Sequence, residues 1–184
     1  MRVRRIVTGE PRSGGSTFTH VEEVVPLEPR AGFAQYHVWG WDGAPTLPLH
    51  QPEPYVARSH FPPNGGVRVT ANVLGGVSPS SDTSDPDDEH RVDSEEFTRL
   101  IGLEPRGRTT GSVPGMHRTD TIDIGVVVSG QVTVECEDGS SVTMCPGDVY
   151  VQNGAQHAWR PNPDNPALVV FVLIGARRNP TQAE

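Results

Sequence analysis

A histidine, two threonines and an aspartate recur at alternate positions in one stretch near the C-terminal end of the chain. The stretch is GMHRTDTIDIGVVVSG, and the four residues are His117, Thr119, Thr121 and Asp123. Side chains alternate between the two faces of a β-strand, so these four would share one face if the stretch is extended. One imidazole, two hydroxyls and a carboxylate on one face form a set that can hold a small molecule and move a proton.

A second histidine, His157, follows three turn signals, at Asp138-Gly139, Pro146-Gly147-Asp148 and Asn153-Gly154. Strands that reverse direction at these turns would bring His157 back to the face that carries His117. A histidine beside a carboxylate can titrate close to neutral pH, where proton transfer is efficient. Trp159 lies two residues further on and should face the same way, either at the mouth of a pocket or in an ordinary core position.

These stretches resemble the two motifs of the cupin superfamily. The first motif is G, five residues, H-x-H, three or four residues, E, six residues, G. With its final glycine at Gly130, the H-x-H position falls on His117-Arg118-Thr119 and the Glu position on Asp123. The second motif is G, five residues, P-x-G, two residues, H, three residues, N. The segment from Pro146 to His157 resembles it, but is one residue shorter and lacks the proline of P-x-G.

The resemblance implies a ligand set that is incomplete here. Metal-binding cupins usually hold their ion with three histidines and one glutamate, but this chain has Thr119 and Asp123 at two of those positions. The remaining metal ligands would be His117, Asp123 and His157, which suits Fe(II) and would also suit Zn, Mn or Ni. The alternative is a pocket without metal, in which Asp123 accepts hydrogen bonds from the threonines and both histidines are neutral.

Short strands joined by tight turns should build the whole chain, because it has 20 glycines and 18 prolines among 184 residues. The predicted strands are Arg2–Thr8, Val21–Leu27, Ala34–Trp41, Tyr55–Phe61, Val67–Leu74, Thr121–Val128, Gln131–Glu137, Ser141–Met144, Val149–Gln152 and Leu168–Ile174. Together with the resemblance, this pattern predicts an all-β fold, a cupin double-stranded β-helix (jelly-roll barrel) with extra N-terminal strands and one short helix.

The chain divides into five predicted segments. Residues 1–75 form an N-terminal strand extension that packs on the barrel, and 76–93 form an acidic loop, outside the barrel or as a lid over its mouth. Residues 94–113 hold a short helix that begins after Ser94 and a connection to the barrel. The barrel core spans 114–176, and 177–184 form a tail.

The overall charge and hydropathy narrow the partners. The net charge is −8 and all 15 basic residues are arginine, with no basic stripe that would favour nucleic acid. The mean hydropathy is −0.43, and no apolar run is long enough to span a membrane. We therefore expect a cytoplasmic protein with no nucleic-acid or membrane partner. Unpaired strand edges favour a homodimer in which the N-terminal strands cover a neighbour. Cys136 and Cys145 match no zinc pattern and are expected to be buried thiols.

The expected function is an enzyme acting on a small organic metabolite inside the barrel. Family analogy favours a lyase or isomerase step in specialised metabolism, such as dehydration, decarboxylation or cyclisation. His117, Asp123 and His157 would be catalytic, and Thr119, Thr121, Trp159 and His60 would bind substrate. One alternative is an Fe(II)-dependent oxygenase with a 2-His-1-carboxylate site, and another is a metal-free protein that binds a small molecule without turnover.

Overall fold

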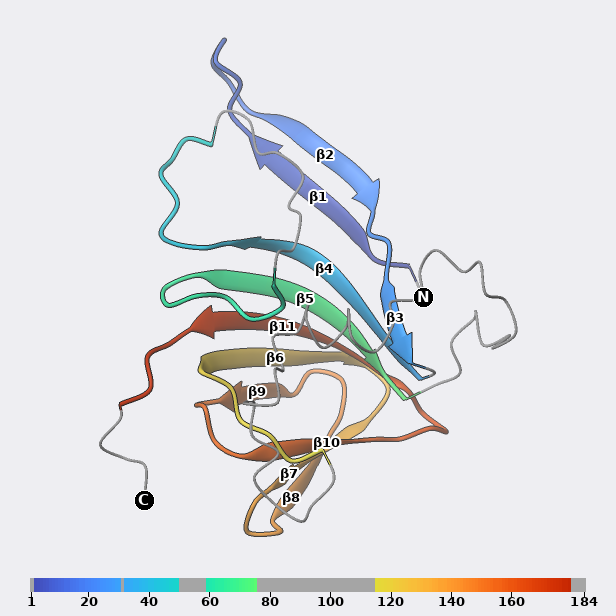
Figure 1. Cartoon of the computed structure of the whole chain (residues 1–184). Helices are drawn as coiled ribbons and strands as arrows, with labels where there is room; N and C mark the ends of the chain where they lie inside the picture. Colours follow the sequence, from blue (N-terminus) through green and yellow to red (C-terminus); the bar gives the residue numbers. More distant parts are fainter. Residues whose placement is uncertain (1, 31, 50–58, 76–114, 180–184) are drawn as a thin grey trace.

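The computed structural model describes residues 2–30, 32–49, 59–75 and 115–179 (Figure 1). The expected acidic loop, the expected short helix and most of the expected strand Tyr55–Phe61 lie outside these residues. In the described part the secondary structure consists of antiparallel strands, so the all-β fold expected from the sequence is confirmed.

The strands form two sheets and a separate hairpin. The larger sheet has six strands in the order β3 (Leu27–Arg30), β4 (Phe33–Trp41), β5 (Val67–Leu74), β11 (Ala167–Gly175), β6 (Thr121–Ser129) and β9 (Val149–Gln152). The smaller sheet has the order β10 (His157–Pro161), β7 (Val132–Cys136) and β8 (Ser141–Met144). The hairpin is β1 (Arg4–Gly9) and β2 (Thr17–Glu23), which lies beyond β4 at one end of the molecule (Figure 1). Of the N-terminal extension, β3, β4 and β5 thus continue the same sheet as β11 and β6, whereas β1 and β2 do not.

The apolar core fills the space between the two sheets. Along β6 and β11 every second residue is buried, because one face of each strand points toward the smaller sheet. The buried cluster includes Val127, Val169, Phe171 and Leu173 from the larger sheet, and Val132, Val134 and Met144 from the smaller one. Each such side chain contributes about 1.5–3 kcal/mol when it leaves water. This cluster fixes the distance between the sheets.

Two glycines permit close approaches that shape the barrel. A Cβ on Gly125 of β6 would lie 2.7 Å from the ring of Phe171, so only glycine lets that ring cross the strand. Gly130 has a φ of 71° in the turn after β6, and a Cβ there would lie 1.9 Å from the Pro166 carbonyl oxygen. Both glycines hold β6 tightly against its neighbours.

The outer face of the larger sheet is apolar and exposed at its β6–β9 end. The outward residues of β6 pair across the sheet with those of β9, Ile124 with Val151 and Val126 with Val149. We call this surface the outer strip; its members are 36% to 62% exposed, and they are Ile122, Ile124, Val126, Val128, Val149 and Val151. Such contiguous apolar surface is unusual on an isolated monomer.

The structure also bears on the expectations for the two cysteines and for membrane-spanning segments. Cys136 and Cys145 are both free and exposed, so the expectation of buried thiols was wrong: Cys136 is the last residue of β7, and Cys145 directly follows the end of β8. Within the described residues, the chain has no helix that is both long and apolar enough to cross a membrane.

Candidate functional site

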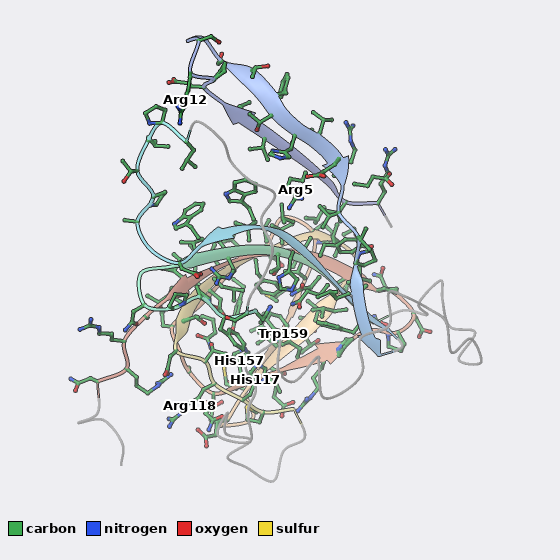
Figure 2. The ribbon with its side chains drawn as sticks, turned by 45° about the horizontal axis from the view of Figure 1, so that its top comes forward. Arg5, Arg12, His117, Arg118, His157 and Trp159 are labelled. Atoms are coloured by element: carbon green, nitrogen blue, oxygen red, sulfur yellow. The ribbon has the colours of Figure 1, made fainter. Side chains whose placement is uncertain are left out.

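His117 and His157 are held side by side by their own backbones. The N–H of each donates to the carbonyl of the other, with both N···O distances at 2.9 Å, in an isolated antiparallel bridge. The bridge adds His117 to the free edge of β10, on the side away from β7. The ring centroids are 4.5 Å apart, and both side chains lie beneath β4 and β5 (Figure 2). The structure therefore brings together the two histidines singled out in the sequence.

The Nδ1 atoms of these two rings have defined partners. Nδ1 of His117 lies 2.8 Å from the Gly115 carbonyl, which can only accept, so Nδ1 carries the proton and Nε2 is left as an acceptor. Nδ1 of His157 lies 3.0 Å from the Ala155 carbonyl and 2.9 Å from the side-chain amide nitrogen of Gln152. In one tautomer Nδ1 donates to Ala155, and in the other it accepts from Gln152. Neutral His157 can therefore present Nε2 either as an acceptor or as a donor.

Asp123 is buried on the inner face of β6. It lies directly across from Gln152 of β9, which places the two side chains on the same face. Its Oδ1 atom is buried and has no hydrogen-bond partner among the described residues. Burial raises the pKa of Asp123 to about 6, against the effect of a hydrogen bond from Thr121. Gln152 thus lies across the strand pair from Asp123, and its side-chain amide lies within hydrogen-bond distance of His157.

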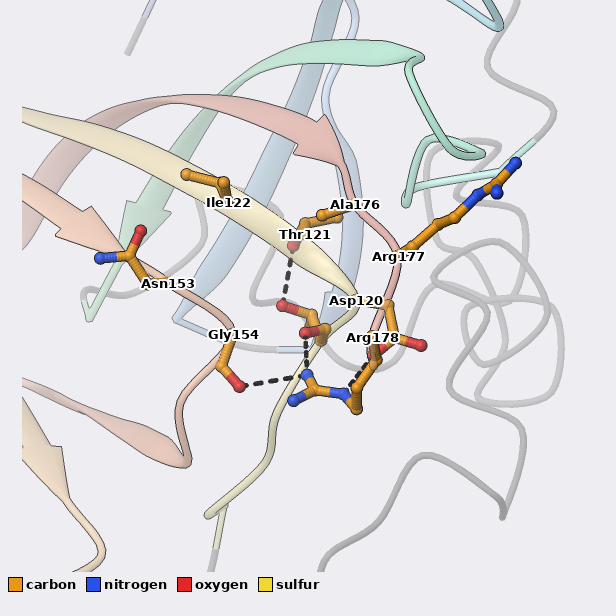
Figure 3. A pocket seen from close by; sticks show the side chains of 9 residues that line it. Asp120, Thr121, Ile122, Asn153, Gly154, Ala176, Arg177 and Arg178 are labelled. Carbon is orange, nitrogen blue, oxygen red and sulfur yellow. Dashed lines mark hydrogen bonds and ion pairs between the residues drawn. The ribbon is translucent and has the colours of Figure 1, made fainter. Parts of the chain in front are cut away.

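Thr119 and Thr121 lie where the inner face of β6 begins. Both are buried, and their hydroxyls share a hydrogen bond of 2.8 Å. They also border a surface depression of about 190 Å³ at this end of the sheet (Figure 3). Arg178 crosses this depression, donating to Asp120 at 2.6 Å and to the carbonyls of Thr119 and Gly154 at 2.8 and 3.1 Å. The two threonines connect the buried face to the surface.

Trp159 forms an aromatic wall next to His157. Its ring makes edge-to-face contacts with Tyr150 and Phe171, at centroid distances of 5.3 and 5.4 Å, and lies 6.0 Å from the His157 ring. Burial raises the pKa of the Tyr150 phenol, as do the nearby Cys136 and Asp123. Trp159 therefore packs against the apolar core beside His157, and its place at the mouth of a pocket stays a prediction.

His60 lies next to His37 of β4. Their ring centroids are 5.8 Å apart. Burial lowers the pKa of His60 to about 3, and the charges of His37, Arg68 and His117 lower it further. Burial and then Arg68 lower the pKa of His37 to about 4. His60 is thus close enough to His117 to sense its charge, and it is neutral at physiological pH.

The sequence analysis missed the polar residues on the inner face of β4 and β5. Gln35, Thr70 and Asn72 are buried there, beside His37. The sequence does contain a pattern that could have indicated them, because Arg68, Thr70 and Asn72 alternate with valine and alanine along β5. Alternation alone, however, does not show which face of the strand is buried. Arg68 is the anchor of this face, since it donates to the carbonyls of Ser59 and Trp41 and pairs with Asp42 at 2.5 Å.

The arrangement of His117, Asp123 and His157 bears on whether they could hold a metal ion. The described residues contain no group of three or more His, Cys, Asp or Glu side chains arranged to hold a metal ion. The histidine pair does show one feature of metal ligands, a backbone carbonyl at Nδ1. Two imidazoles are nevertheless fewer than the three protein ligands typical of catalytic sites. The set of His117, Asp123 and His157 is not assembled as ligands here, and it stays a prediction.

Comparison with known proteins identifies the family. No family model matches the chain. Oryzines biosynthesis cluster protein J of Aspergillus oryzae is 31% identical over 148 residues, which cover 74% of this chain and 78% of that protein. The cupin-domain-containing oxidoreductase srdB of Neurospora crassa is 35% identical over 77 residues, or 41% of this chain and 37% of that protein. The chain belongs to the cupin superfamily. Among solved structures, this cupin is similar to KdgF from Halomonas sp., with a TM-score of 0.40 and 15% identity over 83% of this chain and 88% of that one.

The first prediction concerns acid stability of this cupin. Burial lowers the pKa of His157 to about 4, and it also lowers those of His37 and His60. Below about pH 6.5 these histidines bind protons in the unfolded chain but stay neutral in the folded one. The free energy of unfolding therefore falls as the pH drops from 6.5 toward 4. By pH 5 the cost is about 2 kcal/mol for each histidine. Asp123 opposes this in part, because its raised pKa favours the folded state on acidification from 6 toward 4.

Urea unfolding at pH 7 and pH 5 measures the effect. The substitution His60→Leu should reduce the difference in unfolding free energy between the two pH values by about 2 kcal/mol, since it removes one of the three histidines. His20→Asn, in the hairpin outside the barrel, is the matched control. Equal stability at the two pH values would show that these histidines are not buried in the folded protein.

Proposed function

We propose that this cupin is an enzyme of small-molecule metabolism that moves a proton on an organic substrate, in a lyase or isomerase step. The observation that carries the proposal is the buried Asp123 carboxylate, which has an unpartnered Oδ1 and a pKa raised to about 6. A general base of this strength is almost fully ionised at pH 7 and still accepts protons readily. The similarity to a protein of the oryzines biosynthesis cluster supports a role in specialised metabolism.

In this mechanism Asp123 removes a proton from a carbon next to a carbonyl group. The electron pair of the C–H bond moves onto the carbonyl oxygen, which becomes an enolate. His157, with Gln152 donating to its Nδ1, carries a proton on Nε2 and donates a hydrogen bond to that oxygen. Return of the proton at another carbon completes an isomerisation, and loss of a leaving group from the neighbouring carbon completes an elimination.

The burial of the site supports this chemistry. His157, Asp123 and Thr121 are each less than a tenth exposed, so substrate replaces water around the reacting atoms and electrostatic interactions there are strong. Nε2 of His117 accepts a hydrogen bond from substrate, and the hydroxyl groups of the threonines orient it. Trp159 provides an apolar surface for the carbon skeleton.

A second candidate is an oxidoreductase that uses the same three residues as metal ligands. The observation that favours it is the name of the Neurospora crassa relative, a cupin-domain-containing oxidoreductase. The match spans 41% of this chain and 37% of that protein. Binding of a small molecule without turnover is the remaining outcome.

The proton-transfer proposal predicts deuterium exchange into a model substrate. In D2O the protein should accelerate exchange of the acidic C–H protons of 2-tetralone, an aromatic ketone, followed by NMR. The rate should fall on acidification through about pH 6, because the Asp123 carboxylate becomes protonated there. Asp123→Asn should lower it by about 100-fold or more. The control is Asp164→Asn in an exposed turn, and exchange that survives Asp123→Asn would refute the assignment of Asp123.

Metal content separates the two candidates. We expect exchange to persist after dialysis against EDTA, because the groups that move the proton belong to the chain itself. Elemental analysis of protein purified without a His tag or chelator, alongside His117→Ala, provides the measurement. Near-stoichiometric iron that disappears in His117→Ala, with oxygen consumption in the wild type, would instead favour the oxidoreductase.

A further inference from the structure

The inner face of β4 and β5 carries buried polar atoms that lack partners. Among the described residues these atoms are Nδ1 of His37, Oγ1 of Thr70 and Oδ1 of Asn72, with Nδ1 of His60 beside them. Thr70 is fully buried, and Asn72 and His60 are more than nine-tenths buried. An unpartnered buried polar atom destabilises the fold, so a native protein keeps several together only where something else satisfies them.

Several of these atoms can accept a hydrogen bond but cannot donate one. Nε2 of His37 lies 3.1 Å from the Gln35 side-chain oxygen, which can only accept, so Nε2 carries the proton and the unpartnered Nδ1 is an acceptor. Oδ1 of Asn72 can only accept, and so can Oδ1 of ionised Asp123. The hydroxyl of Thr70 and the ring of His60 can do either. The unpartnered atoms that face inward on the strands thus include several that can only accept a hydrogen bond and none that can only donate one.

The sheet order places these acceptors beside the candidate active site. Thr70 of β5 is directly paired with Phe171 of β11 and with His37 of β4. Phe171 contacts Trp159, which lies against His157. His60 lies beside His37 on the same face, near enough to His117 for that residue to lower the pKa of His60. A molecule at the histidine pair would therefore meet an aromatic wall on one side and the acceptors of β4 and β5 on the other.

We infer that the inner face of β4 and β5 is a ligand-binding wall that selects a neutral molecule rich in hydrogen-bond donors, such as a polyhydroxylated aromatic compound. This inference rests on the proposed function for the position of the reacting atoms, and it adds the chemical class of the substrate. The wall offers no free cation to an anionic ligand, since the guanidinium of Arg68 pairs with Asp42 and backbone carbonyls. Hydroxyl or amide N–H groups satisfy acceptors that otherwise reduce the stability of the fold.

A matched pair of probes tests the donor requirement. Resorcinol has two hydroxyl donors, and 1,3-dimethoxybenzene has the same ring without them. In NMR titrations of the full-length protein, resorcinol should bind about tenfold more tightly and shift signals from β4 and β5. Asn72→Leu and Thr70→Val should abolish that preference, while Thr143→Val on the smaller sheet should keep it. Equal binding of the two probes, or binding of neither, would overturn the inference.

Two further readouts separate a ligand wall from a purely structural one. Asn72→Leu and Thr70→Val should raise the midpoint of thermal unfolding, because each replaces an unpartnered polar group with an apolar one of similar shape. A structural role would lower it. Long-range ¹H–¹⁵N spectra report which nitrogen of His37 bears the proton, and a proton on Nδ1 would overturn the inference. If the protein exchanges deuterium into 2-tetralone but binds the two probes equally, only the inference about this wall is refuted. If it prefers resorcinol but catalyses no exchange, only the proposed reaction is refuted.

A separate observation concerns the outer strip defined above. At the β4 end the outer face of the sheet is covered by the chain's own hairpin, where Arg5 donates to the Val38 carbonyl and lies over the Trp39 ring. At the β6–β9 end no described element covers it. The hairpin itself has a second apolar surface, since Ile6, Phe18 and Val21 are 53% to 67% exposed.

The geometry points to a second copy of this chain as the occupant of the outer strip, with the exposed face of its hairpin packed on β6 and β9. The two apolar surfaces lie at opposite ends of the sheet (Figure 1), so one two-fold axis would cover both surfaces in both copies. The outer strip has no charged side chain, which lets two chains of net charge −8 approach there. The N-terminal strands would then cover a neighbour, as expected from the sequence.

Light scattering after size-exclusion chromatography gives the test. The wild type should have about twice the chain mass of 19.9 kDa, and Val149→Glu and Phe18→Glu should each reduce it to the mass of one chain. Val142→Glu is the matched control, because Val142 is a similarly exposed valine on the smaller sheet. A monomeric wild type, or a dimer that survives either substitution, would overturn this arrangement.

Discussion

The reciprocal backbone hydrogen bonds between His117 and His157 are the contact on which the rest of the site depends. His117 leads into β6 of the larger sheet, and His157 begins β10 of the smaller one. The bridge therefore ties the two sheets together at the point where their inner faces meet. Because backbone atoms make the tie, the two imidazoles keep their spacing whatever their protonation state. The carbonyl of Gly115 then fixes how the His117 ring is turned, and the Ala155 carbonyl or the Gln152 amide, depending on the tautomer, fixes the ring of His157.

Burial of polar groups behind this bridge has two consequences with the same cause. Desolvation favours the neutral form of every titratable group, so it lowers the pKa values of His37, His60 and His157 and raises that of Asp123. Only the shift of Asp123 brings a pKa closer to neutral pH, as the proposed proton transfer requires, while the three histidines become neutral there. The shifts also reduce the stability of the folded state, which the apolar cluster around Phe171 must offset. Conflict between stability and local chemistry is typical of functional sites.

The sequence predicted the parts of this structure that depend on local signals. Val67–Leu74, Ser141–Met144 and Val149–Gln152 have the predicted bounds, because turn residues and β-branched runs mark them directly. The pairing of His117 with His157 followed from parity and turn counting. The wall on β4 and β5 could not be predicted, because it depends on the sheet order that places β5 next to β11. Along β5 the valines face outward and the polar residues inward, the reverse of what burial of apolar residues alone would suggest.

The two faces of β6 show why a polar interior and an apolar exterior belong together. Inward, the strand presents Thr121 and Asp123, and outward it presents Ile122 and Ile124. A polar inner face weakens the hydrophobic stabilisation that an ordinary β-sandwich draws from its core. Burial of the outer face against a second chain would supply apolar contact from the other side of the same sheet. A slip of one residue in the register of β6 would exchange the two faces, and the close contact between Gly125 and Phe171 opposes such a slip. One strand thus positions both the carboxylate proposed as the base and the surface proposed for association through a single register.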